Sequence, residues 1–467
     1  MQIDLLLILK QELLITAVIF FLLILKVSSE VKNETLLNVI NVILFVNCLS
    51  GFFFIHTGSL FSEMYRTNQL MALEKNMLSI GTFIISLQSW SWLKKHQHVT
   101  EFYIILLSTL LGMFFLISAG NLLMFYLGLE LSTIPLAAIA NFDLQKRQSS
   151  EAAMKLIISS AFSSSLLLFG ISLLYGTTGS LTFSQITGHL TNNPLQVFSF
   201  ILILAGFAFK ISVVPFHLWT ADVYEGAPVA VTSYLSVVSK GAVLFTFISA
   251  LYTVFKPLVG SWYNMLFLLS VLTILTGNLF AIRQHNMKRF LAFSSIAQVG
   301  FILIGITGTS RLGTTSVVYF IFIYIFSNLA AFGVVSLVSS LTGRESINDY
   351  KGFYRTNPLL SWTLALALFS LAGVPPTAGF FGKFFLLMSG AGKGNYVFIT
   401  IAALNMIISF YYYLRIVKAI FMDQNDMPIE RISIPAYPKL ALYVCISGIL
   451  IPGLFSYFYN YIHSLSA

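Results

Sequence analysis

Long apolar segments recur along nearly the whole chain, and short polar segments separate them. A helix needs about 20 apolar residues to cross a bilayer, and fourteen segments meet that length. The expected spans are 5–27, 35–56, 70–93, 101–119, 121–141, 154–175, 196–218, 228–250, 262–282, 289–307, 314–341, 358–390, 396–421 and 436–460. The pattern therefore predicts an all-α, polytopic membrane protein whose polar gaps are too short to fold as soluble domains.

Two of the predicted spans contain residues that break helices. The seventh span, 196–218, holds Pro215, and the twelfth span, 358–390, holds two prolines and three glycines around its midpoint. Proline removes a backbone hydrogen bond and clashes with the preceding turn. We therefore expect both helices to be interrupted near mid-membrane, each beside a lysine: Lys210 in the seventh span and Lys383 in the twelfth.

The two broken spans predict an internal repeat. Spans four to eight and spans nine to thirteen form two five-span blocks, and the broken span is the fourth of each block. A block with an odd number of spans inverts the copy that follows it, as in transporters with inverted repeats. Within one membrane domain, 1–467, we expect three N-terminal helices in 1–100, a first repeat in 101–250, a second in 262–421, and a C-terminal helix at 436–460.

Composition and charge support a membrane location and predict an orientation. Hydrophobic residues make up 57% of the chain and charged residues 9%, whereas soluble proteins carry roughly 25% charged residues. The net charge is +9, but the basic residues are scattered in ones to threes, so no patch for nucleic acid is expected. Seventeen lysines and arginines fall in loops after odd-numbered spans and five in the opposite loops. This bias predicts that both termini lie outside the cytoplasm.

Four charged residues lie inside predicted spans at positions that water does not reach freely. Glu130, Lys210 and Lys240 lie about 15, 20 and 18 Å along their spans, close to the middle of the membrane. An unpaired charge there costs from about 3 to more than 10 kcal/mol, so such residues usually mark a proton or ion path. The alternative is a structural ion pair that sets helix packing. Three lysines, with Lys383 as the third, and one glutamate at a common depth favour the proton path.

Lysine suits proton transfer because its affinity for a proton depends on its surroundings. A nearby carboxylate stabilises the ammonium form, and burial without such a partner destabilises it. Moving or neutralising Glu130 would therefore release a proton from Lys210, whereas arginine stays protonated. The second half of the twelfth span is expected to begin near Thr377. Its N-terminal dipole is expected to disfavour a cation at Lys383 and to ease proton release.

The other polar groups near these spans leave alternatives open. His217 could relay protons or hydrogen-bond a helix end. Asp222 and Glu225 follow the seventh span, where a solvated or helix-capping role is expected. Glu74 and Lys75, near the outer end of the third span, are expected to extend toward the membrane surface.

The sequence carries no sign of a redox cofactor. Cys48 and Cys445 lie in different apolar segments and form no Cys-x-x-Cys motif, so neither a disulfide framework nor an iron–sulfur site is expected. No Gly-x-Gly-x-x-Gly follows a strand, so no dinucleotide site is expected either. We expect no cofactor and no metal in this chain.

Four stretches carry a resemblance over essentially the full length: FYLGLELSTIPL around Glu130, FKISVVPFHLWTADVYEGAP around Lys210, SYLSVVSKGAV around Lys240, and LAGVPPTAGFFGKFFLL around Lys383. With them the chain resembles the antiporter-like subunits of proton-pumping NADH–quinone oxidoreductase, respiratory complex I. The Tyr-Glu-Gly of WTADVYEGAP and the lysine that ends GFFGK are similar to the N type of these subunits. Multisubunit sodium/proton antiporters share the scaffold.

The resemblance implies roles for the intramembrane charges. Glu130 and Lys210 form the coupled pair, Lys240 the central relay and Lys383 the distal lysine. It also implies that NADH, FMN, iron–sulfur clusters and quinone bind to other subunits. The implied partners are M-type and K-type membrane subunits, the peripheral arm and the lipid bilayer, and the implied location is the bacterial inner membrane.

Two other functions stay open at this point. The chain could be a subunit of a sodium/proton antiporter, which shares the lysine row, or a structural membrane scaffold. Copurification of subunits that oxidise NADH separates the first alternative from the complex I interpretation. A scaffold would tolerate neutral residues at all four intramembrane charges.

Overall fold

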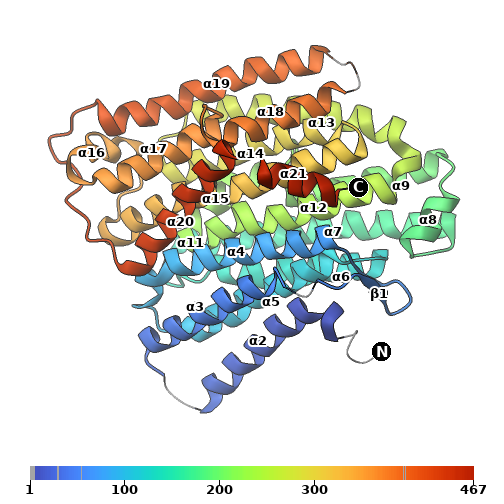
Figure 1. Ribbon diagram of the computed structural model, residues 1–467, viewed down its shortest axis with the longest axis horizontal. Coiled ribbons are helices and arrows are strands. Elements are labelled where there is room, and N and C mark those ends of the chain that lie inside the picture. The colour runs from blue at the N-terminus through green and yellow to red at the C-terminus, as the bar shows by residue number, and fades with distance from the viewer. Residues whose placement is uncertain (1–5, 29–30, 54, 393, 395, 467) are drawn as a thin grey trace. The chain divides into compact units, whose positions relative to one another are not determined.

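A computed structural model describes residues 6–28, 31–53, 55–392, 394 and 396–466 (Figure 1). Most of the described chain is helical, and one antiparallel hairpin pairs β1 (Gly58–Leu60) with β2 (Tyr65–Thr67). The α-helices are α2 Lys10–Ser28, α3 Asn33–Ser50, α4 Gln69–Leu93, α5 Val99–Ile117, α6 Leu122–Ala140, α7 Arg147–Thr178, α8 Phe183–His189, α9 Pro194–Lys210, α10 Leu218–Gly226, α11 Val229–Tyr234, α12 Lys240–Thr253, α13 Val259–Ile282, α14 Met287–Ile306, α15 Ser310–Thr342, α16 Phe353–Thr356, α17 Pro358–Ala372, α18 Ala378–Ala391, α19 Tyr396–Phe421, α20 Ala436–Leu454 and α21 Tyr457–Leu465. Three short segments complete the set: the π-helix η1 (Leu235–Ser239) and the 3₁₀-helices η2 (Lys256–Leu258) and η3 (Ile347–Tyr350).

The predicted all-α membrane fold is confirmed. Within the described ranges, twelve helical segments are long and apolar enough to cross a membrane. They coincide with every predicted span except the seventh and the twelfth. Each of those two is divided, into α9 and α10 and into α17 and α18, at the positions that the prolines and glycines predicted. The sixth span is longer than expected, because α7 extends over 32 residues.

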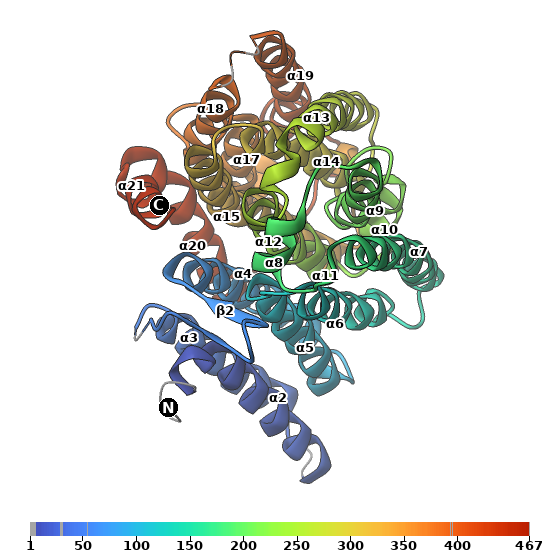
Figure 2. The ribbon, with the colours of Figure 1, turned by 90° about the vertical axis from the view of Figure 1, so that its right-hand side faces the viewer.

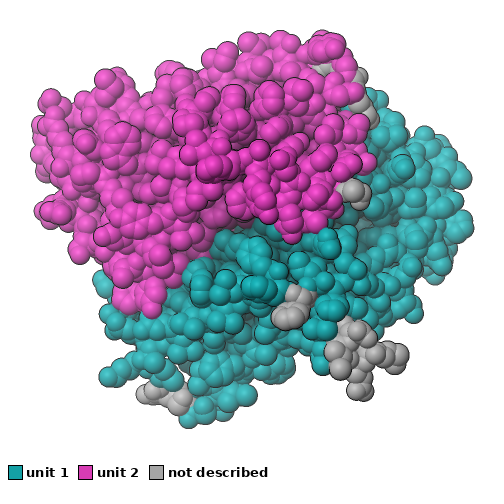
Figure 3. Space-filling model, viewed as in Figure 1, with its two compact units in different colours: residues 1–83, 93–212, 238–265 teal, residues 84–92, 213–237, 266–467 magenta. Residues whose placement is uncertain are grey.

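The chain forms two compact units, coloured separately in Figure 3. Unit 1 comprises residues 1–83, 93–212 and 238–265, and unit 2 comprises 84–92, 213–237 and 266–467. The boundaries between the units fall inside α4, η1 and α13, and two residues after the end of α9. Parts of a single predicted span therefore belong to different units. The inverted repeat expected for 101–250 and 262–421 stays a prediction.

In unit 1, α5 runs beside α6 (Figure 2), and α7 packs along α9. Asn193 caps α9, its side-chain oxygen accepting from the Gln196 amide at 2.8 Å. Gly206 allows α9 to approach α7 closely, because a Cβ atom there would lie 2.6 Å from a methyl carbon of Leu167. Small residues permit such close contacts between membrane helices. This contact places the C-terminal end of α9 against α7.

In unit 2, the helices α14 and α15 are buried along most of their length and form the core. Around α15 pack α17, α18 and α20. The side chain of Asn286 caps α14 by accepting from the amides of Lys288 and Arg289. Both halves of the broken twelfth span therefore rest on the buried core of this unit.

Lys75 lies in a buried ion pair in unit 1, and the expectation that it extends to the membrane surface is wrong. Its side chain is 1% exposed, and its ammonium contacts Glu12 at 2.5 Å and the hydroxyl of Tyr65 at 2.9 Å. Glu74, beside it, is also buried. A lysine near a helix end usually extends into the headgroup region, but a carboxylate on α2 gives this one an internal partner.

We predict that Lys75→Met lowers the unfolding free energy of the purified protein by about 3–5 kcal/mol, because it leaves the Glu12 carboxylate buried without a cation. Thermal and denaturant unfolding in detergent would measure the loss. Lys94→Met is the matched control: Lys94 pairs with Glu34 at 3.0 Å on the exposed surface, and its loss should cost less than about 1 kcal/mol. Equal effects of the two substitutions would contradict the prediction, and adding Glu12→Gln to Lys75→Met should recover part of the loss.

Candidate functional site

Lys210 is the last residue of α9, and its side chain is almost fully buried in unit 1. Its ammonium donates hydrogen bonds to the hydroxyl of Thr133 on α6, at 2.9 Å, and to the hydroxyl of Ser160 on α7, at 2.6 Å. The position at the end of α9 adds the partial negative charge of the terminal carbonyls, which favours a cation. Three helices therefore meet at this one ammonium group.

Glu130 lies three residues before Thr133 on α6, so the two side chains share a face of that helix. It is close enough to act on the Lys210 ammonium electrostatically, but the hydrogen bonds of that ammonium go to the two hydroxyls. One Glu130 oxygen, Oε1, is buried without a hydrogen-bond partner. The described residues show no direct hydrogen bond between Glu130 and Lys210, and the expected coupling of the two stays a prediction.

Sequence reasoning missed Thr133 and Ser160. For Thr133 a signal was available, because a hydroxyl three residues from an intramembrane glutamate lies on the same helix face. Ser160 belongs to the serine-rich stretch ISSAFSSS on α7, where nothing in the sequence separates one serine from the next. Only the packing of α9 against α7 selects it.

The break after Lys210 has an unusual backbone. Ser212 adopts a left-handed conformation with φ of 65°, and Val214–Pro215 is a cis peptide bond. The left-handed conformation costs about 1–2 kcal/mol for a residue with a Cβ atom, and strained residues of this kind cluster at functional sites. The chain then resumes as α10 at Leu218.

Lys240 is the first residue of α12 and is 2% exposed. It follows directly on η1, a π-helical segment, and segments of this kind often occur at functional sites. Within unit 2, Asn328 on α15 donates to the Ser236 hydroxyl of η1 at 2.6 Å. The irregular turn before Lys240 is therefore held in place by a buried side chain.

Lys383 lies on α18 at the second break, where it is 1% exposed. Its ammonium donates to the carbonyl of Ala372 at 3.2 Å and lies over the ring of Phe301 at 4.8 Å. Ala372 is the last residue of α17, so the ammonium meets the negative end of a helix dipole. The long side chain thus reaches back to the other half of the span, and the expected effect of the N-terminal dipole of α18 stays a prediction.

A close contact between α17 and α18 makes this reach possible. A Cβ atom at Gly379 would lie 1.8 Å from the carbonyl oxygen of Ser370, so only glycine fits at this position. The two halves of the broken span therefore overlap at their facing ends, and the side chain of Lys383 returns to the terminal carbonyl of α17.

A buried hydrogen-bond group near Lys383 was also missed. Gln298 on α14 donates to the Tyr413 hydroxyl at 3.0 Å and to the Leu371 carbonyl at 2.8 Å. One turn earlier on α14, the Ser295 hydroxyl accepts a hydrogen bond from the Tyr324 hydroxyl of α15 at 2.9 Å. Each of these residues looks unremarkable in an apolar sequence, since a single amide or hydroxyl in a span more often ties helices together.

Three polar residues that the sequence singled out follow the first break: His217, Asp222 and Glu225. His217 stands directly before α10, and its side chain makes no capping hydrogen bond. Asp222 and Glu225 on α10 both accept from Arg289 of α14, at 2.7 and 2.9 Å, with all three side chains about one-third exposed. The two carboxylates therefore attach α10 to α14 rather than standing free in water.

Metal-ligating side chains do not gather in the described parts of the chain: no group of three or more histidines, cysteines, aspartates or glutamates lies close enough to hold an ion. Cys48 and Cys445 are buried free thiols. The side chains that meet at Lys210 are a lysine, a glutamate and two hydroxyls, and groups of these kinds can exchange protons.

The sequence family described as "NADH:quinone oxidoreductase/Mrp antiporter, TM" matches residues 119–409, which contain all four intramembrane charges. A relative from Phocaeicola vulgatus, named NADH-quinone oxidoreductase subunit N, is 48% identical over 406 residues, which is 86% of each chain. The chain belongs to the subunit N family of NADH-quinone oxidoreductases. The family predicted from the four sequence stretches is thereby confirmed.

Two solved structures share the fold of this chain. A chain of respiratory complex I from Thermus thermophilus, solved with bound aureothin, has a TM-score of 0.82 and 26% identity and covers 95% of this chain and 97% of that one. A chain of the Mrp complex from Dietzia sp. DQ12-45-1b has a TM-score of 0.87 at 18% identity and covers 100% of this chain and 97% of that one. At that identity the second likeness shows a shared fold alone.

Proposed function

We propose that this chain is a proton-translocating subunit in the membrane arm of respiratory complex I, where it moves protons while other subunits carry electrons from NADH to quinone. The names of its relatives support the complex. The observation that carries the proton role is the Lys210 site: a lysine buried in a membrane protein, bound by two hydroxyls and exposed to the field of Glu130.

Hydroxyl partners suit a lysine that gains and loses a proton. A hydroxyl accepts a hydrogen bond from an ammonium and, after rotating, donates one to a neutral amine. Thr133 and Ser160 therefore satisfy Lys210 in both protonation states, which a carboxylate alone cannot do. Glu130 then sets the balance between the charged and the neutral form of Lys210. Its negative charge favours the ammonium form, and its neutralisation favours release of the proton from Lys210.

Lys240 and Lys383 extend the proposed relay along the membrane. Both are buried, and each lies at an irregular point of its span, after η1 or beside the second break. We assign Lys240 to the central position and Lys383 to the distal half, with His217 as a further candidate relay at the first break. NADH, FMN, iron–sulfur clusters and quinone would be held by other subunits of the complex.

A sodium/proton antiporter subunit is the second candidate, supported by the structural likeness to the Mrp complex and by the family model, whose description names both classes of protein. That likeness extends to the fold, whereas relatives at 48% and 46% identity carry the subunit N name. Purification of the native membrane complex decides between the two. Peripheral subunits that oxidise NADH should accompany the chain, together with M-type and K-type membrane neighbours. We place the complex in the bacterial inner membrane.

We predict that Lys210→Ala and Glu130→Ala each lower proton pumping and quinone-reductase turnover by about tenfold or more in complexes that still assemble, since a proton-transfer group typically contributes a factor of 10² to 10⁴. Proton uptake per NADH oxidised in reconstituted vesicles gives the first quantity. The double substitution should cost much less than the product of the two single effects, because coupled groups are not additive. Near-normal pumping by assembled Lys210→Ala complexes would refute the role.

The two hydroxyls supply a graded control for this experiment. Thr133→Val together with Ser160→Ala keeps Lys210 but removes its hydrogen-bond partners. We therefore expect a loss of proton pumping smaller than that of Lys210→Ala. Ser165→Ala removes a hydroxyl from an exposed position of α7, the helix that carries Ser160, and should not change proton pumping. If both sets behave alike, the hydroxyls have no part in proton transfer.

For Lys383 we predict that arginine fails nearly as completely as alanine. Arginine keeps the positive charge but does not release a proton, so a titrating lysine is not replaced by it, whereas a structural cation largely is. Proton uptake per NADH oxidised and assembly on native gels would be compared for Lys383→Arg and Lys383→Ala. Full pumping by the arginine form would make Lys383 a packing residue.

The loop charges predict that Lys146 and Arg431 face the cytoplasm and that Thr191 faces outward. All three residues are exposed, so cysteines placed there can react with a membrane-impermeant thiol reagent. The native Cys48 and Cys445 are buried and should add little background. In intact cells the cysteine at 191 should be labelled, and labelling at 146 instead would invert the topology.

A further inference from the structure

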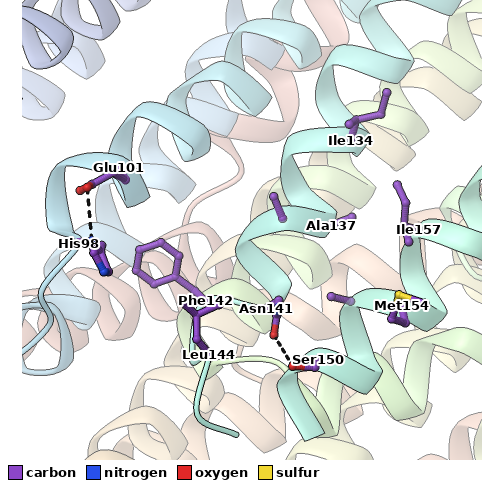
Figure 4. A pocket seen from close by; sticks show the side chains of 12 residues that line it. His98, Glu101, Ile134, Ala137, Asn141, Phe142, Leu144, Ser150, Met154 and Ile157 are labelled. Carbon is purple, nitrogen blue, oxygen red and sulfur yellow. Dashed lines mark hydrogen bonds and ion pairs between the residues drawn. The ribbon is translucent and has the colours of Figure 1, made fainter. Parts of the chain in front are cut away.

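An open groove of about 750 Å³ lies between the ends of α5, α6 and α7 in unit 1. Figure 4 shows Ile134 and Ala137 on α6 opposite Met154 and Ile157 on α7. The eight residues from Ile134 to the C-cap Asn141 extend about 10 Å along the helix axis, so the groove runs from the loop level toward the membrane interior. Its wall is apolar and has the dimensions of part of an acyl chain.

A second pocket, of about 390 Å³, adjoins the groove at the loop level and shares His98, Phe142 and Leu144 with it. Lys95, His96 and Lys146 line this pocket, so the polar end carries basic groups. The His96 ring stacks on Phe142 with a centroid separation of 4.6 Å, and burial lowers the pKa of this histidine.

The charges at the polar end leave one cation without a partner. The carboxylate of Glu101 pairs with Lys26 at 2.9 Å, and that of Asp143 pairs with Lys146 at 2.9 Å. Among the described residues, Lys95 is exposed and forms no ion pair. An anion that enters the polar pocket therefore meets an available ammonium, while the local carboxylates are already neutralised.

We propose that the two joined pockets bind one anionic phospholipid, with an acyl chain in the groove and its phosphate beside Lys95. The chemistry of both ends fits this ligand, and the loops that form the polar end lie on the side predicted to face the cytoplasm. Basic pockets between membrane helices on that side commonly bind anionic headgroups. A protein partner would leave the continuity between an apolar groove and a basic pocket unexplained.

The groove lies on the same helix pair that holds Lys210. Ile134 follows Thr133 directly, and Ile157 lies three residues, nearly one turn, before Ser160. A lipid chain between α6 and α7 would therefore fix the separation of the two hydroxyls. This functional consequence, unlike the lipid site itself, rests on the proposed function.

The test uses the intact complex, extracted into native nanodiscs from membranes that contain photoreactive phosphatidylglycerol, with photoreactive phosphatidylcholine in a parallel arm. Lys95→Gln removes the free cation, and Ala138→Trp fills the groove from an exposed position. Lys32→Gln, at another exposed loop residue on the same predicted side, is the matched control. After illumination, the labelled peptides and the lipid retained per complex are measured by mass spectrometry.

Phosphatidylglycerol should label residues 134–157. Labelling should fall about fivefold in Lys95→Gln, because one basic residue contributes about 1 kcal/mol to the binding of an anionic lipid. Ala138→Trp should abolish it, and Lys32→Gln should leave it unchanged. Equal labelling by both lipids, no change in either pocket variant, or cross-links from this segment to a neighbouring subunit in place of lipid would each overturn the proposal. Lipid labelling and proton pumping are measured in separate experiments. The result of one therefore refutes or supports the lipid site without deciding the proton role.

Discussion

The cost of placing a lysine ammonium inside a membrane protein governs the arrangement of this chain. Such a charge is stable only where polar groups replace its water, and a continuous apolar helix offers none. At the first break, Lys210 occupies the end of α9 and binds hydroxyls on two other helices, α6 and α7. At the second break, Lys383 binds the last carbonyl of α17. At these two sites a buried charge lies beside a helix interruption.

Two kinds of buried lysine occur in this fold. Lys75 contacts the Glu12 carboxylate at 2.5 Å, which holds it in the charged form and stabilises unit 1. Lys210 has neutral hydroxyl partners, with a carboxylate acting only through its field. The first arrangement suits a permanent ion pair, and the second suits a group that changes its charge. Because the partners of Lys210 come from α6 and α7, a small shift of either helix alters the site.

The sequence predicted much of this fold because its determinants are local. Span lengths follow from apolar runs, and helix breaks follow from proline and glycine, whose effects act within a turn or two. The four intramembrane charges were conspicuous for the same reason, since few charged residues occur in the spans. Glu130 and Thr133 share a helix face by spacing alone. The family could also be identified, because the motifs around these charges are continuous stretches of sequence.

The partners of the charges were decided by tertiary structure. The sequence placed Lys75 near a membrane surface, and only the packing of helices within unit 1 brings Glu12 of α2 to it. It gave no hydrogen-bond partner for Lys383, and only the tertiary structure shows that the flexible side chain reaches the carbonyl end of α17. Ser160 stands out from its serine-rich surroundings only once α9 packs on α7. The physical reason is the same in all three cases. A hydrogen bond forms only when donor and acceptor are placed to within a few tenths of an ångström, and that placement depends on how two helices pack. Sequence spacing determines only which face of one helix a side chain occupies.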